Sequence, residues 1–227
     1  MNIAVAIIGD GRQQYLSQAV ASLEQHIPQS AVEATIMIND ADGDEVYAAY
    51  LESTYPQMTR FVHHEARRGL AGAVRSAWTA ALEYDVDFIW HAEEDFVLTE
   101  NVPIAQMMYL LTERPYLAQL VLNRPPDPGN AQEVAAGGPM LTAPDQYNER
   151  SDGDLVWSEH ARIFSFNPML ASRAAIECAL ENCTDFLEAG VTTTLLQNGF
   201  TFAFWGGKFD PPKCDHVGLQ RSSGYRW

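Results

Sequence analysis

The chain of 227 residues is 47% apolar and only 19% charged, which is enough apolar material for one large domain with a substantial core. Its formal net charge of −16 excludes a broadly basic surface that would grip nucleic acid by neutralising phosphates. Three cysteines form no even-numbered disulfide framework, the apolar run at residues 3–8 is too short for a signal peptide, and no later run approaches a membrane span. We therefore expect a single compact domain in the cytoplasm.

Apolar runs alternate with helical periodicity along the first hundred residues. The runs "IAVAII" (3–8), "ATIMI" (34–38), "RFVHH" (60–64) and "DFIW" (87–90) predict strands. Segments with apolar residues at helical spacing follow the first three runs, through residue 23 and over residues 46–51 and 70–81. Because buried strands that alternate with helices form parallel sheets, we predict an α/β domain with a Rossmann-like, mostly parallel central sheet flanked by helices.

The second half of the chain is less regular. "LAQLVL" (117–122), "IFSF" (163–166) and "TFAFW" (201–205) predict strands, and helices are expected around residues 174–180 and 188–197. The stretch from residue 123 to residue 154 is rich in Pro, Gly, Asn and Asp, and so long an irregular connection indicates a functional loop. An irregular basic tail is expected from residue 206 onward.

Acidic residues follow several predicted strands. In α/β sheets, ligands bind outside the carboxyl ends of the strands, and Asp10, Asp40 and the run Glu93-Glu94-Asp95 lie there. Adjacent buried carboxylates repel one another unless a cation compensates, and Mn²⁺ or Mg²⁺ would do so through oxygen ligands. The alternatives are a solvated acidic turn for the run and an Asx-turn for Asp40.

Cations are few and gather in two places. "ARRGLAGAVRSAW" opens a helix with two arginines, the second of which is Arg68, and with Gly69, and it carries Arg75 two turns in. Backbone N–H groups at a helix start and guanidinium groups form an anion site; a capped helix with exposed arginines is the alternative. In the tail, His216 can complete a metal site begun by Asp95, and the neighbouring cations can neutralise a diphosphate. Zinc is disfavoured because no second Cys or His pair lies close to Cys214 and His216.

These segments resemble the nucleotide-diphospho-sugar transferases of the GT-A fold, most closely the inverting family 2 glycosyltransferases, over nearly the whole chain. The resemblance implies one GT-A domain over residues 1–227, with a nucleotide-sugar-binding half at about 1–100 and an acceptor-binding half at about 101–227. "HAEEDF" stands where the family has its D-x-D motif, with Glu in place of the first Asp. Metal coordination is thereby assigned to Asp95, with His216 completing the site, and ribose or metal contact to Glu93 or Glu94.

The opening segment "IAVAIIGDGRQQYLSQAVASL" resembles the family's first strand and helix, where an arginine helps to bind the nucleobase; here it is Arg12. Asp40 matches the acid that contacts the nucleoside. Patterns and resemblance together place ten residues against the nucleotide sugar: Gly9, Arg12, Asp40, Arg68, Gly69, Arg75, Glu93, Glu94, Lys213 and Arg221.

The acceptor side is assigned less directly. "DFLEAGVTTTLLQNGF" resembles the segment that carries the family's catalytic base, which nominates Glu188, with Asp185 as the second candidate. The loop at about residues 125–154 is expected to seat the acceptor, with Trp157 and Phe164 as stacking platforms or, alternatively, as core aromatics.

The resemblance implies a metal-dependent transfer of a sugar from a UDP-type donor to an acceptor hydroxyl, with inversion in one displacement. The acceptor can be a glycan, a protein or a small molecule, and the negative charge of the chain disfavours a modified nucleic acid. Two alternatives stay open: a nucleotidyltransferase of similar layout, and a non-catalytic module that binds a nucleotide sugar.

Overall fold

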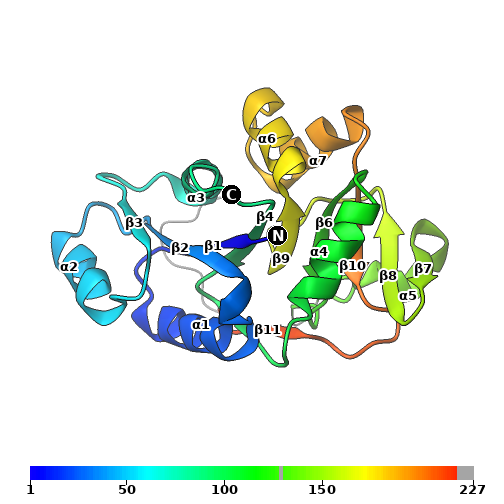
Figure 1. The fold of residues 1–227 in the computed structure, drawn as a ribbon, viewed down its shortest axis with the longest axis horizontal. Coiled ribbons are helices and arrows are strands. Elements are labelled where there is room, and N and C mark those ends of the chain that lie inside the picture. Colours follow the sequence, from blue (N-terminus) through cyan, green and yellow to red (C-terminus); the bar gives the residue numbers. More distant parts are fainter. Residues whose placement is uncertain (128–129, 219–227) are drawn as a thin grey trace.

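The computed structural model of the chain describes residues 1–127 and 130–218, and these residues are built around one large sheet (Figure 1). The sheet has nine strands in the order β3-β2-β1-β4-β9-β6-β10-β8-β7. These strands are β1 (Ile3–Gly9), β2 (Val32–Asn39), β3 (Arg60–His63), β4 (Phe88–Glu93), β6 (Leu117–Leu122), β7 (Asn148–Asp152), β8 (Leu155–His160), β9 (Met169–Ser172) and β10 (Thr201–Trp205).

Most strands of the large sheet run in the same direction. β1 pairs in parallel with β2 and β4, β2 with β3, and β6 with β10, whereas β8 and β9 run antiparallel to their neighbours. A separate antiparallel pair is formed by β5 (Phe96–Leu98), directly after β4, and β11 (Cys214–His216) near the end of the described chain. The predicted α/β domain with a mostly parallel central sheet and flanking helices is confirmed.

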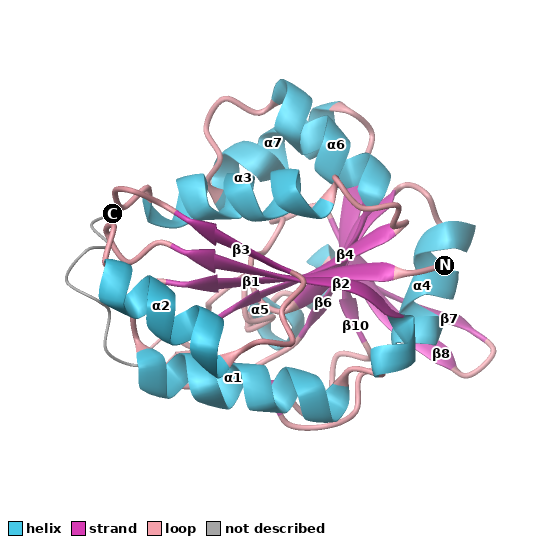
Figure 2. Ribbon diagram, turned by 60° about the vertical axis from the view of Figure 1, so that its left-hand side comes forward, coloured by secondary structure: helices cyan, strands magenta, loops and turns pink. Residues whose placement is uncertain are grey.

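Helices cover both faces of this sheet (Figure 2). Their bounds are α1 (Gln13–His26), α2 (Glu45–Thr54), α3 (Gly69–Ala81), α4 (Ile104–Glu113), α5 (Pro139–Thr142), α6 (Arg173–Asn182) and α7 (Glu188–Gln197), with 3₁₀ turns η1 (Gln29–Ala31) and η2 (Pro144–Gln146). α3, α6 and α7 pack on one face and α1, α2 and α4 on the other. The strand period of two produces this division: Ala4, Ala6 and Ile8 face the first layer, and Ile3 and Val5 face the second.

The prediction of a strand over residues 163–166 is wrong, because the structure has no helix or strand there. The backbone N–H of Phe164 donates to Thr192 Oγ1 at 2.7 Å, and that of Phe166 donates to Glu188 Oε1 at 2.7 Å. Side chains of α7 therefore satisfy this backbone in place of a neighbouring strand, and the strand β9 begins three residues later. Phe164 and Phe166 instead pack edge-on against the fully buried Trp78.

Two other irregular segments contain regular elements. The connection after β6 includes α5, η2 and β7, and the tail includes β11. Within the described residues, no helix combines the length and the apolar character needed to cross a membrane.

Candidate active site

The carboxyl ends of β1, β2 and β4 bring the acidic segments together. Ile8 lies opposite Glu93 in the β1–β4 pairing, and Gly9 lies opposite Asn39 in the β1–β2 pairing. The backbone N–H of Glu94 donates to Ile8 O at 2.8 Å, and that of Asp40 donates to Gly9 O at 2.8 Å. The parallel register therefore places three acidic segments along one edge of the sheet, as expected for a ligand site.

Arg12 lies at the centre of this acidic edge. Its Nε is 3.0 Å from Asp10 Oδ1 and 2.6 Å from Glu94 Oε1, and its Nη2 is 2.9 Å from Asp95 Oδ2. All three carboxyl side chains are at least nine-tenths buried. Burial works against the charge of Arg12, but the three neighbouring carboxylates more than compensate and raise its pKa above the usual value. Arg12 thus acts as a counter-ion within the protein, and its guanidinium is directed at carboxylates.

The three consecutive acids have three different environments. Glu94 is almost fully buried, and its Oε2 accepts the backbone N–H of Asp10 at 3.1 Å. Burial, with the nearby Asp10, raises the pKa of Glu94 to about 9, although Arg12 opposes the shift. A Cβ at Gly9 would lie 3.0 Å from Glu94 Oε2, so glycine leaves room for this carboxylate. Glu94 is therefore held in the floor of the site, whereas Glu93 is half-buried at its surface.

Asp95 faces His216, which β11 carries back to the edge of the sheet. His216 Nε2 is 3.4 Å from Asp95 Oδ2, and His216 Nδ1 is 2.9 Å from Asp127 Oδ1. The imidazole stacks on Phe96 with ring centres 4.8 Å apart. Burial would lower the pKa of His216, but its hydrogen bonds to Asp95 and Asp127 outweigh burial and raise it. The pKa of Asp95 is lowered, because His216 and Arg12 together outweigh its burial.

The donor atoms at this point fit a divalent cation. Asp95 Oδ1 is buried and has no hydrogen-bond partner among the described residues, so one carboxylate oxygen is available to a cation. Because His216 Nδ1 is bonded to Asp127, Nε2 is the nitrogen that faces Asp95, at 3.4 Å from its other carboxylate oxygen, Oδ2. No group of three or more His, Cys, Asp or Glu side chains is clustered for a metal within the described part of the chain. Asp95 and His216 would therefore hold Mn²⁺ or Mg²⁺ together with water and substrate phosphates, as Mg²⁺ sites commonly do.

Asp40 is placed differently from the expected nucleoside contact. Its side chain is fully buried, and its Oδ1 lies 2.7 Å from His64 Nδ1. The same carboxylate accepts the backbone N–H groups of Arg68 at 2.7 Å and Gly69 at 2.9 Å. Asp40 therefore fixes the start of α3, and its carboxylate is used within the protein.

The predicted anion site at the start of α3 is only partly assembled. Gly69 has φ +69°, a backbone conformation that glycine adopts without strain. Arg68 has an exposed side chain there, and Arg67, which the sequence reasoning did not select, donates from Nη2 to Asp10 O at 3.3 Å. Arg75 instead donates to Leu180 O at 3.3 Å, so it ties α3 to α6.

In the described part of the tail, Lys213 is engaged with an acidic residue of the chain. Lys213 forms an ion pair with Glu100, and its backbone N–H donates to Asn123 O at 3.0 Å. Its ammonium group is therefore paired with Glu100 shortly after β5 and is not among the contacts of Arg12. Arg221 lies outside the described residues.

Glu188 lies at the first position of α7 and reaches the site from the side of the second half of the chain. Its carboxylate accepts the N–H of Phe166 at 2.7 Å, and burial raises its pKa. Burial also raises the pKa of Glu93 well above its usual value, with Asp95 and then Glu188 adding to the shift. Glu188 is thus close enough to Glu93 to act on its charge. Asp185 has an exposed side chain, and its carbonyl oxygen accepts from Cys183 Sγ.

The two aromatic residues proposed to stack on an acceptor are core residues. Trp157 is 2% exposed and Phe164 is fully buried. Trp157 Nε1 donates to Glu159 at 2.8 Å, and Glu159 also accepts from Tyr116, which precedes β6 and so lies at the opposite edge of the sheet. The expectation of stacking platforms at these two positions is wrong, and the alternative, that both are core aromatics, is confirmed.

Sequence reasoning missed two members of the site, Arg124 and Asp127. Arg124 follows β6, is 5% exposed, and donates from Nη1 to Asp127 Oδ1 at 3.0 Å. It also lies over the ring of Phe96 at 5.7 Å from the ring centre. The available signals were the position of Arg124 shortly after a predicted strand and the place of Asp127 in the loop that was expected to be functional. The contact between Asp127 and His216 itself spans 89 residues, so no local pattern indicates it.

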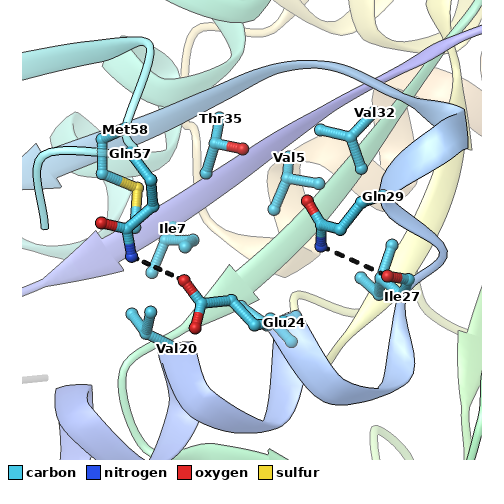
Figure 3. Close-up of a pocket in the computed structure, with 11 residues that line it drawn as sticks. Val5, Ile7, Val20, Glu24, Ile27, Gln29, Val32, Thr35, Gln57 and Met58 are labelled. Carbon is cyan, nitrogen blue, oxygen red and sulfur yellow. Dashed lines mark hydrogen bonds between the residues drawn. The ribbon is translucent and has the colours of Figure 1, made fainter.

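A cavity elsewhere in the molecule is lined by different residues (Figure 3). It lies between α1 and the strands β1 and β2, with Val5, Ile7, Val20 and Met58 among its apolar lining residues. Gln57 and Glu24 form a hydrogen bond of 2.6 Å at its rim. None of the carboxylates at the sheet edge lines this cavity, so it is separate from the candidate active site.

No protein-family model and no curated protein matches the chain. Among solved structures, it is similar to GalNAc-T7 with UDP, GalNAc and Mn²⁺, with a TM-score of 0.66 and 12% identity over 100% of this chain and 45% of that chain. It is also similar to the mannosyltransferase PcManGT from Pyrobaculum calidifontis in complex with GDP-Man and Mn²⁺, with a TM-score of 0.59 and 15% identity over 97% of this chain and 58% of that one. The chain thus spans about half the length of these two proteins. Together with the strand order and the acidic carboxyl edge, this likeness shows that the chain has the GT-A fold of nucleotide-sugar glycosyltransferases.

Proposed function

We propose that the chain is a metal-dependent glycosyltransferase that moves a sugar from a nucleoside diphosphate to an acceptor hydroxyl. The observation that carries the proposal is the pairing of Asp95 and His216 at the carboxyl edge of a GT-A sheet, with Asp95 Oδ1 buried and unpartnered among the described residues. The presence of Mn²⁺ and a nucleotide or nucleotide sugar in both similar structures supports it.

The donor is proposed to lie across the ends of β1 and β4. Asp95 and His216 would hold a divalent ion that, when bound, supplies positive charge to the leaving diphosphate. Arg67 and Arg68 lie near the same edge and can add to the attraction for phosphate. Glu93 is the one residue of the three acids that is not fully buried, so we assign it, and not the deeply bonded Glu94, to the ribose or sugar hydroxyls.

Glu188 is proposed as the base that takes the proton of the acceptor hydroxyl. The N–H of Phe166 fixes the orientation of its carboxylate, and burial raises its pKa, which makes it a better proton acceptor near neutral pH. Glu188 approaches Glu93 from α7, whereas the Asp95–His216 pair sits between β5 and β11. A base and a leaving group held by different elements suit a single displacement with inversion, and the NMR coupling constant of the product's anomeric proton tests this stereochemistry.

The acceptor is proposed to be a glycan, a protein or a small molecule, and the protein to act in the cytoplasm. The formal charge of −16 disfavours an acceptor that is itself a polyanion. The connection after β6, which carries Asp127 and Glu133, lies beside Arg124 and is our candidate for the acceptor loop.

A panel of nucleotide sugars with Mn²⁺ tests the proposal. A ligand at 100 times its Kd stabilises the native state by about 2.7 kcal/mol, which a thermal shift detects. We expect a UDP sugar to give the largest rise in Tm and then to be hydrolysed or transferred; GDP sugars are the comparison. Binding without turnover would indicate a binding module, and release of pyrophosphate from a nucleoside triphosphate and a sugar phosphate would indicate a nucleotidyltransferase. Absence of any shift across the panel would contradict the proposal.

A further inference from the structure

The imidazole of His216 is held by a carboxylate at each nitrogen. Nδ1 is 2.9 Å from Asp127 Oδ1, and Nε2 is 3.4 Å from Asp95 Oδ2. The stack on Phe96 fixes the plane of the ring, with ring planes 21° apart. The shorter of the two polar contacts is therefore made by Asp127, which comes from the connection after β6.

Asp127 is in turn held by a buried cation. Arg124 is 5% exposed, donates from Nη1 to Asp127 Oδ1 at 3.0 Å, and donates from Nε to Asn167 Oδ1 at 3.4 Å. A second contact of Arg124, to Glu133, fastens the guanidinium to the same connection. Arg124 favours the ionised form of Asp127, and an ionised carboxylate can only accept hydrogen bonds.

This arrangement determines which nitrogen of His216 carries the proton. Both neighbours are acceptors, but Asp127 lies 2.9 Å from Nδ1 and Asp95 lies 3.4 Å from Nε2. The shorter contact favours the proton on Nδ1 in the neutral ring, which leaves the lone pair of Nε2 on the side of Asp95. We propose that Asp127 is a positioning residue that fixes the Nδ1–H tautomer of His216 and directs Nε2 at the space beside Asp95. The inference rests on the proposed function in one respect, namely that a divalent ion binds in that space. Partners of this kind orient a ligating histidine and increase its basicity, and their loss weakens metal binding by about 10- to 100-fold.

The substitution Asp127→Asn tests the role, because the amide keeps the size of the side chain but can present either an oxygen or an N–H group to Nδ1. Asp215→Asn is the matched control: Asp215 is exposed, adjacent to His216 and carries the same charge. The first readout needs no metal and no substrate. Ring ¹⁵N shifts of labelled histidine, recorded at a pH at which the ring is neutral, report the tautomer of His216, identified by its absence in His216→Ala.

We expect the Nδ1–H tautomer in the wild type and in Asp215→Asn, and a mixture or the Nε2–H tautomer in Asp127→Asn. An Nε2–H tautomer in the wild type, or no change in Asp127→Asn, would overturn the inference. The second readout is the Kd for Mn²⁺ from its EPR signal, measured with and without UDP. Asp127→Asn is expected to weaken binding by about 10- to 100-fold and Asp215→Asn by less than about twofold.

The two readouts separate the inference from the proposed function. If the wild type binds no Mn²⁺ even with UDP, the proposed function fails, while the tautomer measurement still decides the role of Asp127. If Asp127→Asn binds Mn²⁺ as tightly as the wild type while His216→Ala does not, the positioning role is wrong and the metal site stands.

Discussion

Arg12 Nε donates to Glu94 Oε1 at 2.6 Å, and this bond joins the turn after β1 to the end of β4. The same guanidinium contacts Asp10 and Asp95, so one cation compensates three buried carboxylates. A residue of the chain itself therefore helps to hold the acidic edge together.

Replacing Arg12 with glutamine should destabilise the fold, because it removes the cation that contacts three buried carboxyl groups at once. Loss of one partner from a buried ion pair costs about 3–5 kcal/mol, and urea unfolding of Arg12→Gln should show a decrease of that order in the free energy of unfolding. Arg60→Gln is the control, since Arg60 pairs with the exposed Glu83 and should cost at most about 1 kcal/mol. Equal losses in the two variants would contradict this account.

Removal of the metal, or of its carboxylate, should abolish transfer. Asp95→Asn keeps the size of the side chain but removes the charge that we expect to bind the cation, so activity should disappear and Mn²⁺ should not restore it. Asp85→Asn is the control, because it makes the same substitution at an exposed aspartate, and this variant should remain active. Full activity of Asp95→Asn, or of the wild type in excess EDTA, would rule out a metal-dependent mechanism.

Glu188→Gln should separate donor binding from transfer. A general base contributes about 10²- to 10⁴-fold, so transfer should fall by that factor while the Kd for the donor stays nearly unchanged. In the wild type, transfer should slow as the pH falls through the raised pKa of Glu188, because the carboxylate becomes protonated. Glu181→Gln, an exposed change on α6, is the control. A mild effect at Glu188 would move the role to Asp185.

Two histidines that are buried in the neutral form should each contribute stability that is lost as the solution becomes acidic. Burial lowers the pKa of His91 to about 3, and burial with the nearby Arg162 lowers that of His160 to about 3. In the unfolded chain these two histidines bind protons below a pH of about 6.5, whereas in the folded chain they do so only near pH 3. Their contribution to stability is therefore fully present above a pH of about 6.5 and is lost between about 6.5 and 3. Each histidine contributes a slope of about 1.4 kcal/mol per pH unit.

Urea unfolding at several pH values measures how the free energy of unfolding changes with pH in the wild type and in His160→Phe. The slope should be smaller in His160→Phe by the contribution of one proton. Tyr147→Phe is the control in the same aromatic cluster, because its phenol does not titrate in this range. An unchanged slope in His160→Phe would show that the histidine is protonated in the native state.

Asp40→Asn tests whether Asp40 acts on the fold or on the nucleotide. An amide would turn its N–H₂ group toward one of the backbone N–H groups that Asp40 now accepts, which costs about 1–3 kcal/mol. Asp44→Asn is the control, because Asp44 caps α2 through the N–H of Tyr47 and asparagine is an equally good cap. Weaker nucleotide binding by the folded Asp40→Asn protein, with unchanged stability, would favour the nucleoside contact.

The fold was largely predictable because it depends on local patterns. The continuous apolar runs that became β1, β2, β4, β6 and β10 and the helical spacing that became α3, α6 and α7 are properties of short windows of sequence. The strand expected at residues 163–166 failed because Thr192 and Glu188 from α7 bind its backbone, and no local pattern encodes that competition.

The part of the candidate site that could be predicted is the group of acidic residues that directly follow predicted strands. The sequence by itself determined that acids gather at the carboxyl edge, because parallel strands end together. The resemblance to the GT-A glycosyltransferases then nominated Asp95, His216 and Glu188 for particular roles. Only the tertiary structure decided how these groups are used: Arg12 is directed at carboxylates, Asp40 at the start of α3, Arg75 at α6 and Lys213 at Glu100. The reason is physical, since the partner of a charged side chain depends on distance and burial in space, and residues such as Asp127 and His216 meet only after the chain has folded.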